Sequence, residues 1–396
     1  MDKKRFCREV SDELTNILRY WMDYTLDEAH GGFVGRIDHD DVIFPDAPKG
    51  LVLNARILWS FSAAHNLLQN KSYLAIAKRA FDYITGHFID AAFDGVYWTV
   101  DAKGFPLNTK KQVYAQAFVI YASSEYFIAS GDVKARELAV RLYQLIQKYS
   151  YDPQRGGYFE AFTREWLPIG DARLSDKDEN EVKTMNTHLH ILEAYSTLFK
   201  VWPDKGLAGH IRELLGNFRH HIADPQTGHL RLFFSEDWIA KGSTVSFGHD
   251  IEASWLLQEA AETLEDEVLM AEFAELAVKM ATAASRGLDN DGGLWYETIS
   301  PGNTLVPEKH WWPQAEAMVG FVNAWQVTRE NTWLAKAIHS WEFIKKQIID
   351  SRSGEWVWGI DSDCKVMSSE DKVGIWKCPY HNSRACIEII NRLANA

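Results

Sequence analysis

The stretch DPQRGGYFEAF, residues 152–162, is the third of six similar segments along the chain. In each segment an Asp is followed by turn-forming residues, a Gly and a run rich in aromatic residues. The other five are DEAHGGFVGR from Asp27, DAAFDGVYWTV from Asp90, DPQTGHLRLFF from Asp224, DNDGGLWYET from Asp289 and DSRSGEWVWGI from Asp350. Successive segments start 61 to 72 residues apart in a chain of 396 residues. This spacing indicates a six-fold internal repeat.

Between these segments the hydrophobic pattern is helical. In residues 53–68, for example, apolar side chains recur at steps of three and four, and residues 73–88 repeat the pattern. The first stretch of a pair is apolar nearly all round and should be buried, whereas many of the second stretches are amphipathic and should face water. Six such pairs predict an all-α fold, an (α/α)6 barrel of six helix-pair repeats with short turn or strand segments on one face. An open solenoid is the alternative, but six repeats favour a closed ring.

No change of composition interrupts the series, so residues 1–396 are expected to form a single domain. Lys and Arg total 42 against 55 Asp and Glu, a net charge of -13, which argues against nucleic acid or an anionic membrane as a partner. Residues 1–12 lack the apolar core of a signal peptide, and no run is apolar enough to cross a bilayer. We therefore expect a cytoplasmic protein whose four cysteines are free thiols.

Polar and aromatic residues gather where each predicted inner helix begins. If the ring closes, these ends meet around one pocket, the usual place for an active site. The residues concerned are Arg56, Tyr114, Asn186, His190, His249, Glu252, Trp312, Trp376 and His381.

Spacing within the helix near residue 190 separates two kinds of histidine. At about 100° per residue, Asn186, His190 and Glu193 share one face, whereas His188 lies elsewhere and is predicted to pack in the core. One buried His is usually structural. Three of them at matched positions of the repeats, including His249 and His381, favour a functional set.

Two local features bear on the chemistry of His249 and His381. Glu252 lies three residues after His249 on the same helical face, where a carboxylate can orient the imidazole. The alternative is that Glu252 and Asp250 only serve the helix dipole. His381 follows Pro379 at a helix start, where the positive dipole end disfavours the imidazolium and leaves a neutral general base.

The motifs exclude several chemistries and leave others open. No H-E-x-x-H zinc spacing, phosphate-binding Gly loop or G-x-S-x-G nucleophile is present, so neither a metal nor a cofactor is expected. A glycoside hydrolase that recruits Glu252, Glu316 or Asp178 remains open. Neutral bases on both sides of a carbon next to a carbonyl, with Arg56 for the oxyanion and Trp faces for sugar rings, favour sugar epimerisation or isomerisation.

Five segments carry a resemblance to a known family: LNARILW, TMNTHLH, SFGHDIEASWLL, HWWPQAEAMVGF and WKCPYHNSRAC. Together they resemble the N-acylglucosamine 2-epimerase superfamily and, within it, the cellobiose 2-epimerases. The resemblance extends over essentially the whole chain and implies the same (α/α)6 barrel. It also implies cofactor-independent epimerisation at C2 of the reducing-end glucose of β-1,4-linked disaccharides such as cellobiose, lactose or mannobiose.

The resemblance assigns roles to individual residues. His249 and His381 would be the acid/base pair that moves the C2 proton through a cis-enediol(ate), His190 would assist proton handling, and Arg56 would bind near the reacting oxygens. The residues that would line the sugar sites are Tyr114, Asn186, Glu252, Trp312, Trp376 and, from the loop SDKDENEVK, Asp178.

Other functions remain alternatives at this point. Related aldose–ketose isomerases share the histidines, and a monosaccharide 2-epimerase, a glycoside hydrolase or a non-catalytic carbohydrate binder would use the same barrel. We expect a monomer.

Overall fold

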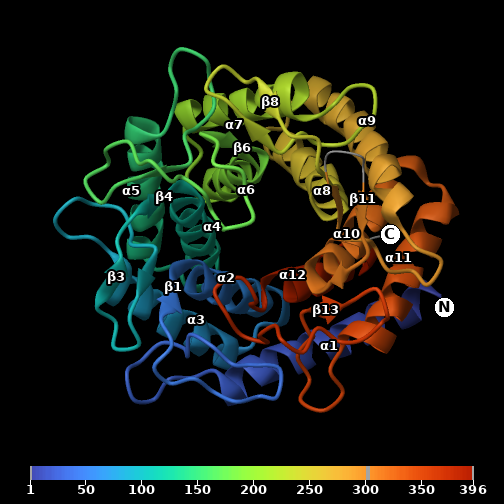
Figure 1. Cartoon of the computed structure of the whole chain (residues 1–396), viewed down its shortest axis with the longest axis horizontal. Helices are drawn as coiled ribbons and strands as arrows, with labels where there is room; N and C mark the ends of the chain where they lie inside the picture. The colour runs from blue at the N-terminus through green and yellow to red at the C-terminus, as the bar shows by residue number, and fades with distance from the viewer. Residues whose placement is uncertain (1, 300–303, 395–396) are drawn as a thin grey trace.

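The computed structural model describes residues 2–299 and 304–394, and in these residues the helices form two concentric rings (Figure 1). The inner ring is built from the stretches predicted to be apolar all round, and nearly all their side chains are buried. Its helices are α2 (Leu51–Leu68), α4 (Val113–Ser130), α6 (Met185–Val201), α8 (Phe247–Thr263), α10 (Trp311–Thr328) and α12 (Tyr380–Ala394). Each packs against the next, and α12 packs against α2, which closes the ring. The (α/α)6 barrel is thus confirmed.

The outer ring consists of amphipathic helices that bury one face against the inner ring. They are α1 (Lys3–Tyr24), α3 (Lys71–Tyr83), α5 (Val133–Tyr149), α7 (Lys205–Asn217), α9 (Glu267–Ala284) and α11 (Asn331–Phe343). Asn or Asp side chains cap the N-termini of α3, α5, α7 and α9 by accepting a backbone N–H. Four outer helices continue into a short segment that is not α-helical. Three of these segments are π-helical, η1 (Ile84–Phe88), η2 (Phe218–Ile222) and η4 (Ile344–Ile348), and one is a 3-10 helix, η3 (Ser285–Gly287).

The sixth helix pair differs from the sequence prediction. Each of the first five inner helices is followed by its outer partner, but α12 is the last helix of the described chain. Its partner is α1, from the other end, which packs along α12. Trp21 of α1 donates its indole N–H to Glu355 of the sixth repeat, and Trp356 Nε1 donates to Glu13 Oε1 of α1 at 2.8 Å. The two chain ends therefore complete one repeat.

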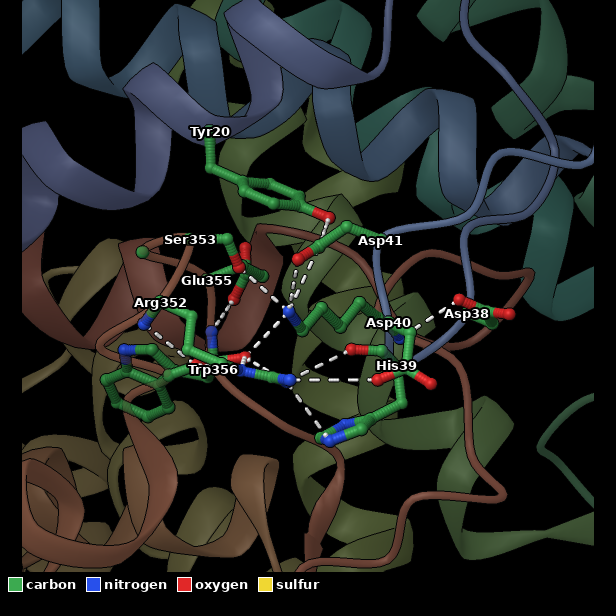
Figure 2. Close-up of polar contacts among 12 residues, drawn as sticks. Tyr20, Asp38, His39, Asp40, Asp41, Arg352, Ser353, Glu355 and Trp356 are labelled. Atoms are coloured by element: carbon green, nitrogen blue, oxygen red, sulfur yellow. Dashed lines mark hydrogen bonds and ion pairs between the residues drawn. The ribbon is translucent and has the colours of Figure 1, made fainter.

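Polar side chains hold this junction together (Figure 2). Lys372 Nζ donates to both carboxylate oxygens of Asp41 at 3.0 Å and to Ser353 Oγ at 2.8 Å, and it also pairs with Asp350 at 2.7 Å. Tyr20 of α1 donates to Asp41 Oδ1 at 3.0 Å. These contacts join the first and sixth repeats, which lie more than 300 residues apart in sequence.

Short strands lie on the face where the inner helices begin. They are β1 (Lys49–Gly50), β2 (Thr99–Val100), β3 (Pro106–Asn108), β4 (Lys111–Gln112), β5 (Ala161–Phe162), β6 (Lys183–Thr184), β7 (Phe233–Phe234), β8 (Ala240–Lys241), β9 (Val245–Ser246), β10 (Glu297–Ile299), β11 (Thr304–Val306), β12 (Lys309–His310) and β13 (Gly359–Ile360). The strand just before an inner helix pairs antiparallel with the next repeat, as β1 with β2 and β4 with β5. An Ile37–Val373 bridge makes the sixth such joint.

The repeated Asp has a buried partner that explains its recurrence. In four repeats a Lys two residues before the inner helix reaches back to this Asp: Lys49 to Asp27, Lys111 to Asp90, Lys183 to Asp152 and Lys309 to Asp289, at 2.6 to 2.9 Å. The sixth repeat uses Lys372 and Asp350. In the fourth repeat Val245 occupies the Lys position, and Asp224 pairs with Arg231 at 2.6 Å instead. We call these five Lys–Asp pairs the repeat clasps.

In four repeats the fourth residue of the inner helix accepts a backbone N–H from the segment that follows the repeated Asp. In the third repeat this residue is His188, which accepts the backbone N–H of Tyr158 at its Nε2 at 2.9 Å, while its Nδ1 lies 2.6 Å from Thr184 O. Gly157 precedes Tyr158 with φ +78°, and a Cβ there would lie 2.7 Å from His188 Nε2, so only Gly fits. Gln116 and Gln314 hold their repeats in the same way. His188 is a packing residue, as its spacing predicted.

Among the described helices, none combines the length and the apolar character that crossing a bilayer would require.

Candidate active site

A cavity of about 400 Å3 opens where the six inner helices begin. Every residue predicted for the site lines this cavity: Arg56, Tyr114, Asp178, Asn186, His190, His249, Glu252, Trp312, Trp376 and His381. All six inner helices contribute, and the loop around Asp178 adds a wall from the third repeat. The structure thus brings the ten residues together, while their roles remain to be assigned.

A common register explains why these side chains converge. Most of them occupy the second or the sixth position of an inner helix, and residues four apart lie on the same helical face. The second positions hold Tyr114, Asn186, Trp312 and His381, and the sixth positions hold Arg56, His190, Glu252 and Glu316. Three site residues depart from this register: His249 is at the third position of α8, and Asp178 and Trp376 lie outside the inner helices.

His190 is held by a carboxylate of its own helix. Its Nδ1 lies 2.9 Å from Glu193 Oε2, and Tyr380 donates its hydroxyl to Glu193 Oε1 at 2.5 Å. Burial opposes ionisation of Glu193, but Arg384 and His190 outweigh it and lower the pKa of this carboxyl to about 2. An ionised carboxylate accepts a hydrogen bond from Nδ1–H, so in the neutral ring of His190 the lone pair is on Nε2.

His381 is held by a carboxylate from the neighbouring helix α10. Its Nδ1 lies 2.7 Å from Glu316 Oε1, and its ring centroid is 5.7 Å from that of Trp312. Burial lowers the pKa of the imidazole well below its ordinary value. Glu316, which the sequence offers as a candidate hydrolase carboxylate, is the second carboxylate in the site that holds an imidazole.

The expected pairing of His249 with Glu252 is wrong. His249 Nδ1 lies 2.9 Å from the hydroxyl oxygen of Ser246, the N-cap residue of α8. Glu252 instead accepts from Arg384 Nη2 at 2.5 Å, because a buried carboxylate is stabilised far more by a guanidinium than by a neutral imidazole. Burial lowers the pKa of His249 to about 4. The His249 ring centroid lies 4.8 Å from that of Trp312, so both predicted acid/base residues adjoin this Trp.

Asp250 does not act as a free charge at the N-terminus of α8. Its Oδ1 accepts the backbone N–H of Leu230 at 2.8 Å, and its Oδ2 lies 2.6 Å from His229 Nδ1. Asp250 therefore accepts a backbone N–H from its own repeat, as His188 does in the third repeat.

Glu252, Glu316 and His381 place three ligand atoms within 4.8 Å of one another, a spacing that suits a metal ion. In this cluster, however, Arg384 Nη2 contacts both Glu252 Oε1 and Glu316 Oε1, at 2.5 and 2.6 Å. The guanidinium thus fills the position and supplies the charge that a cation would bring. The donor set fits an arginine–carboxylate cluster better than a metal centre.

The same contacts bear on glycoside hydrolysis. That reaction needs two carboxyl groups on opposite sides of the scissile bond, about 5 to 9.5 Å apart. Glu252 and Glu316 instead share a single nitrogen of Arg384. This pair is therefore not arranged for hydrolysis.

Arg56 is buried and faces the cavity beside a phenol. Its Nη2 donates to the Tyr114 hydroxyl at 2.8 Å, and its guanidinium carbon lies 4.4 and 4.8 Å from the ring centroids of Phe118 and Tyr380. Within residues 2–299 and 304–394, no carboxylate pairs with it. A buried cation that is held by aromatic rings rather than by an anion is available to a negatively charged oxygen.

Aromatic rings form the wider wall of the cavity. The Trp376 ring lies 6.0 Å from the Tyr114 ring, and Trp358 and Tyr296 line the cavity although they were not predicted. Trp358 belongs to the aromatic run of the sixth repeat, whose backbone accepts the first N–H of α10, and this membership was the available signal. Asp178 accepts the backbone N–H of Ser175 at 2.9 Å, and burial raises the pKa of its carboxyl.

A second cavity of about 800 Å3 continues from the first toward the third, fourth and fifth repeats. Asp178, Asn186, His249 and Tyr296 line both cavities. His249 therefore lies where the two cavities meet, and together they have room for more than one sugar ring.

A sequence profile of the N-acylglucosamine 2-epimerase family (GlcNAc 2-epimerase) matches residues 31–385 of the chain. The chain belongs to this family. As a member it is an isomerase. It is 48% identical to a cellobiose 2-epimerase of Bacteroides fragilis, over 97% of this chain and 98% of that protein.

Solved structures agree with this assignment. The structure of a cellobiose 2-epimerase from Bacillus thermoamylovorans superposes with a TM-score of 0.94 at 37% identity, covering 98% of this chain and all of that one. A D-mannose isomerase structure superposes with a TM-score of 0.85 at 20% identity over 97% of both chains, a likeness that extends to the fold alone.

Proposed function

We propose that the chain catalyses the epimerisation at C2 of the reducing-end glucose of β-1,4-linked disaccharides, without a cofactor. The observation that carries the proposal is the placement of His249 and His381, which both adjoin Trp312, in one cavity with the buried cation Arg56. Two imidazoles and one cation are what proton transfer next to a carbonyl requires.

In the proposed reaction the open-chain aldehyde of the reducing-end sugar lies between the two imidazoles. One of them removes the C2 proton, the C–H electrons form the C1–C2 double bond, and negative charge develops on the C1 oxygen. The other histidine takes up a proton from water and delivers it to C2 from the opposite face, and the carbonyl re-forms. The first histidine releases its proton to water, so both imidazoles are neutral again at the end of the turnover and no co-reactant is consumed.

His381 is well prepared to hold the transferred proton. Its Nδ1–H donates to Glu316, so its Nε2 faces the substrate, and the carboxylate stabilises the imidazolium as it forms. His249 has only the Ser246 hydroxyl at Nδ1. His190, oriented by Glu193, assists by hydrogen bonding to the substrate oxygens.

Arg56 stabilises the enediolate. Its guanidinium already donates to the Tyr114 hydroxyl, whose own proton is then directed toward the cavity. Both groups address the oxygen where charge develops, and burial strengthens that interaction because little water competes.

The remaining residues bind sugar rings. Trp312 and Trp376 present flat apolar faces, on which a pyranose can stack, and Asp178, Asn186 and Glu252 offer polar atoms for its hydroxyls. The Asn186 Oδ1 is buried and has no partner in the described structure, so it is free to accept from a ligand hydroxyl.

Two features support a disaccharide over a monosaccharide. The cavity that adjoins the first one has room for a second ring, and the two relatives described above, each covering nearly the whole chain at more than 35% identity, carry the name cellobiose 2-epimerase. We therefore expect cellobiose, lactose and mannobiose to be substrates.

The product identifies the reaction. Incubation with lactose and analysis of the sugars by NMR should show epilactose, in which the reducing end is mannose. Accumulation of the ketose alone would assign an aldose–ketose isomerase, and free galactose and glucose would assign a hydrolase. Turnover of free glucose or mannose but not of disaccharides would assign a monosaccharide enzyme, and binding without any product would assign a carbohydrate binder.

A further inference from the structure

Arg384 lies at the centre of the inner ring and is almost completely buried. It is the fifth residue of α12, one turn after His381. Its Nη1 contacts Glu193 of α6 and the Tyr380 hydroxyl, and its Nη2 contacts Glu252 of α8 and Glu316 of α10. A single side chain therefore ties together carboxylates from three other helices.

Two of these carboxylates are the groups that orient histidines. Glu193 holds Nδ1 of His190, and Glu316 holds Nδ1 of His381. The two contacts lie on different nitrogens of one planar guanidinium, whose fork geometry fixes both carboxylates at once. Displacement of Arg384 would therefore disturb both imidazoles together.

We propose that Arg384 is a positioning residue of the epimerisation: it keeps Glu193 and Glu316 ionised and in place, so that His190 and His381 both present an unprotonated Nε2 to the substrate. The inference rests on the proposed function for its consequence in catalysis. The claim about the histidine tautomers stands on the contacts alone.

The electrostatic reason lies in the number of charges. Three carboxylates meet in a buried space, and like charges at such distances cannot all remain ionised without a cation. If Arg384 is removed, one carboxyl takes up a proton and no longer accepts from its histidine. Burial already raises the pKa of Glu316, with Arg384 acting against that shift, so Glu316 is the group expected to protonate first.

Other charged groups face the cluster but do not replace Arg384. Arg56 acts on His381 through charge without a contact to the three carboxylates, and Tyr380 donates a single hydrogen bond to Glu193. The further titratable groups around the cluster are His190, His249, Tyr121, Glu259 and Glu388. None of these groups supplies a second cation.

The variants are Arg384→Gln, Arg384→Lys and Arg384→Ala, with Arg392→Gln as the matched control. Arg392 lies two turns further along α12 and contacts Glu388, Asn323 and Gln326 at the opposite end of the barrel. Both substitutions to Gln remove an arginine of the same helix that pairs with a carboxylate, although Arg392 is partly exposed and Arg384 is buried. Only one of them touches the histidine partners.

For Arg384→Gln we expect kcat on cellobiose to fall at least about 30-fold, with KM changed by less than about threefold. The acid limb of kcat/KM against pH should move up by about one pH unit or more. Arg384→Lys should retain an intermediate rate, since its ammonium reaches fewer oxygens. Guanidinium chloride at millimolar concentration should partly restore Arg384→Ala. Arg392→Gln should show the wild-type acid limb and no rescue.

Nitrogen-15 NMR of the histidines gives a readout that does not depend on turnover. In the wild-type protein the Nδ1 atoms of His190 and His381 should resonate as protonated and the Nε2 atoms as unprotonated, and Arg384→Lys should shift or broaden both. The NMR experiment can confirm the histidine tautomers even if the wild-type protein epimerises no sugar. A failure of the proposed function is thereby distinguished from a failure of the proposed role of Arg384.

A folded Arg384→Gln with the wild-type kcat and acid limb would overturn the inference. So would a loss of rate that guanidinium does not reverse, accompanied by unchanged histidine spectra in Arg384→Lys, because that pattern is what a purely structural role predicts. If Arg384→Gln does not fold, the kinetics and spectra of Arg384→Lys decide between the same two outcomes.

Discussion

The Nδ1 atom of His381 lies 2.7 Å from Oε1 of Glu316, and the same oxygen lies 2.6 Å from Arg384 Nη2. The other oxygen of Glu316 accepts from Trp255 Nε1 at 3.1 Å. Glu316 is therefore fixed from three sides, and it fixes the imidazole in turn. The base of the proposed reaction is oriented before any substrate binds, which lowers the cost of reaching the reactive geometry.

Replacement of either proposed acid/base residue should abolish most of the activity. His249→Ala and His381→Ala are each expected to lower kcat about 100-fold or more, because a positioned general acid or base contributes at least that factor. Initial rates of epilactose formation from lactose check this. Wild-type rates in both variants would remove the two histidines from the mechanism.

Substitution of the two histidines of α6, which are two residues apart, should have different effects: one should lower the activity and the other the stability. His190→Gln should lower kcat at least about tenfold with little loss of stability. His188→Gln should lower the free energy of unfolding by about 1 to 3 kcal/mol, because its two buried hydrogen bonds to Tyr158 and Thr184 are disturbed, while kcat per folded molecule is retained. Urea unfolding and steady-state kinetics of both variants test the contrast, and a His188 variant that is stable but inactive would contradict it.

The acid limb of the pH–rate profile should lie below the ordinary histidine range. An imidazole that removes a proton must be neutral, and burial lowers the pKa of His249 to about 4 and that of His381 well below its ordinary value. As the pH falls from 7, kcat/KM should hold through pH 6.5 and decline only toward pH 4 to 5. The profile should be recorded in buffers of constant ionic strength. An acid midpoint at 6.5 or above would show that these histidines are not shifted in the active enzyme.

The repeat clasps should matter more to stability than surface ion pairs do. Lys183 is fully buried, and its ammonium donates to Asp152, Gly156 O and Glu236 O at 2.8 to 2.9 Å. Lys183→Met leaves a buried carboxylate unpaired and should cost about 3 to 5 kcal/mol. The double variant with Asp152→Asn should recover part of that loss.

The matched control for the clasp is Lys78→Met. Lys78 pairs with Asp82 at 2.7 Å on the surface, and both side chains are more than half exposed. Its removal should cost less than about 1 kcal/mol. Equal effects of the two Lys substitutions in urea unfolding would show that burial does not set the strength of the clasp.

Much of the fold could be predicted because each repeat has its own recognisable pattern of residues that are close together in the sequence. The Asp–Gly segments and the helical periodicity between them are set by turn chemistry and by burial, and both recur six times. The pairing of α12 with α1 could not be predicted in this way, because it depends on ring closure between the two ends of the chain. The Lys of each clasp was visible in the sequence as KG, KQ, KT and KH before four inner helices, but its partner lies about 20 to 30 residues away.

The site was predictable as far as helical register reaches. Asn186 and His190 share a face by their spacing, and the same second and sixth positions would have selected Glu316 beside Trp312. The error at His249 has the opposite cause. Spacing placed Glu252 near it, but Arg384, from another helix, binds that carboxylate more strongly than a neutral imidazole does. Contacts between helices, such as those of Arg384, leave no trace in local spacing.

The measurement that tests the central claim most directly is epimerisation of cellobiose in D2O, followed by NMR of the product. Proton transfer through the two histidines predicts that the new mannose end carries deuterium at C2, that the glycosidic bond stays intact, and that His381→Ala forms no labelled product. An epimer that carries no solvent deuterium at C2, or a sample that contains only free glucose, would contradict the account.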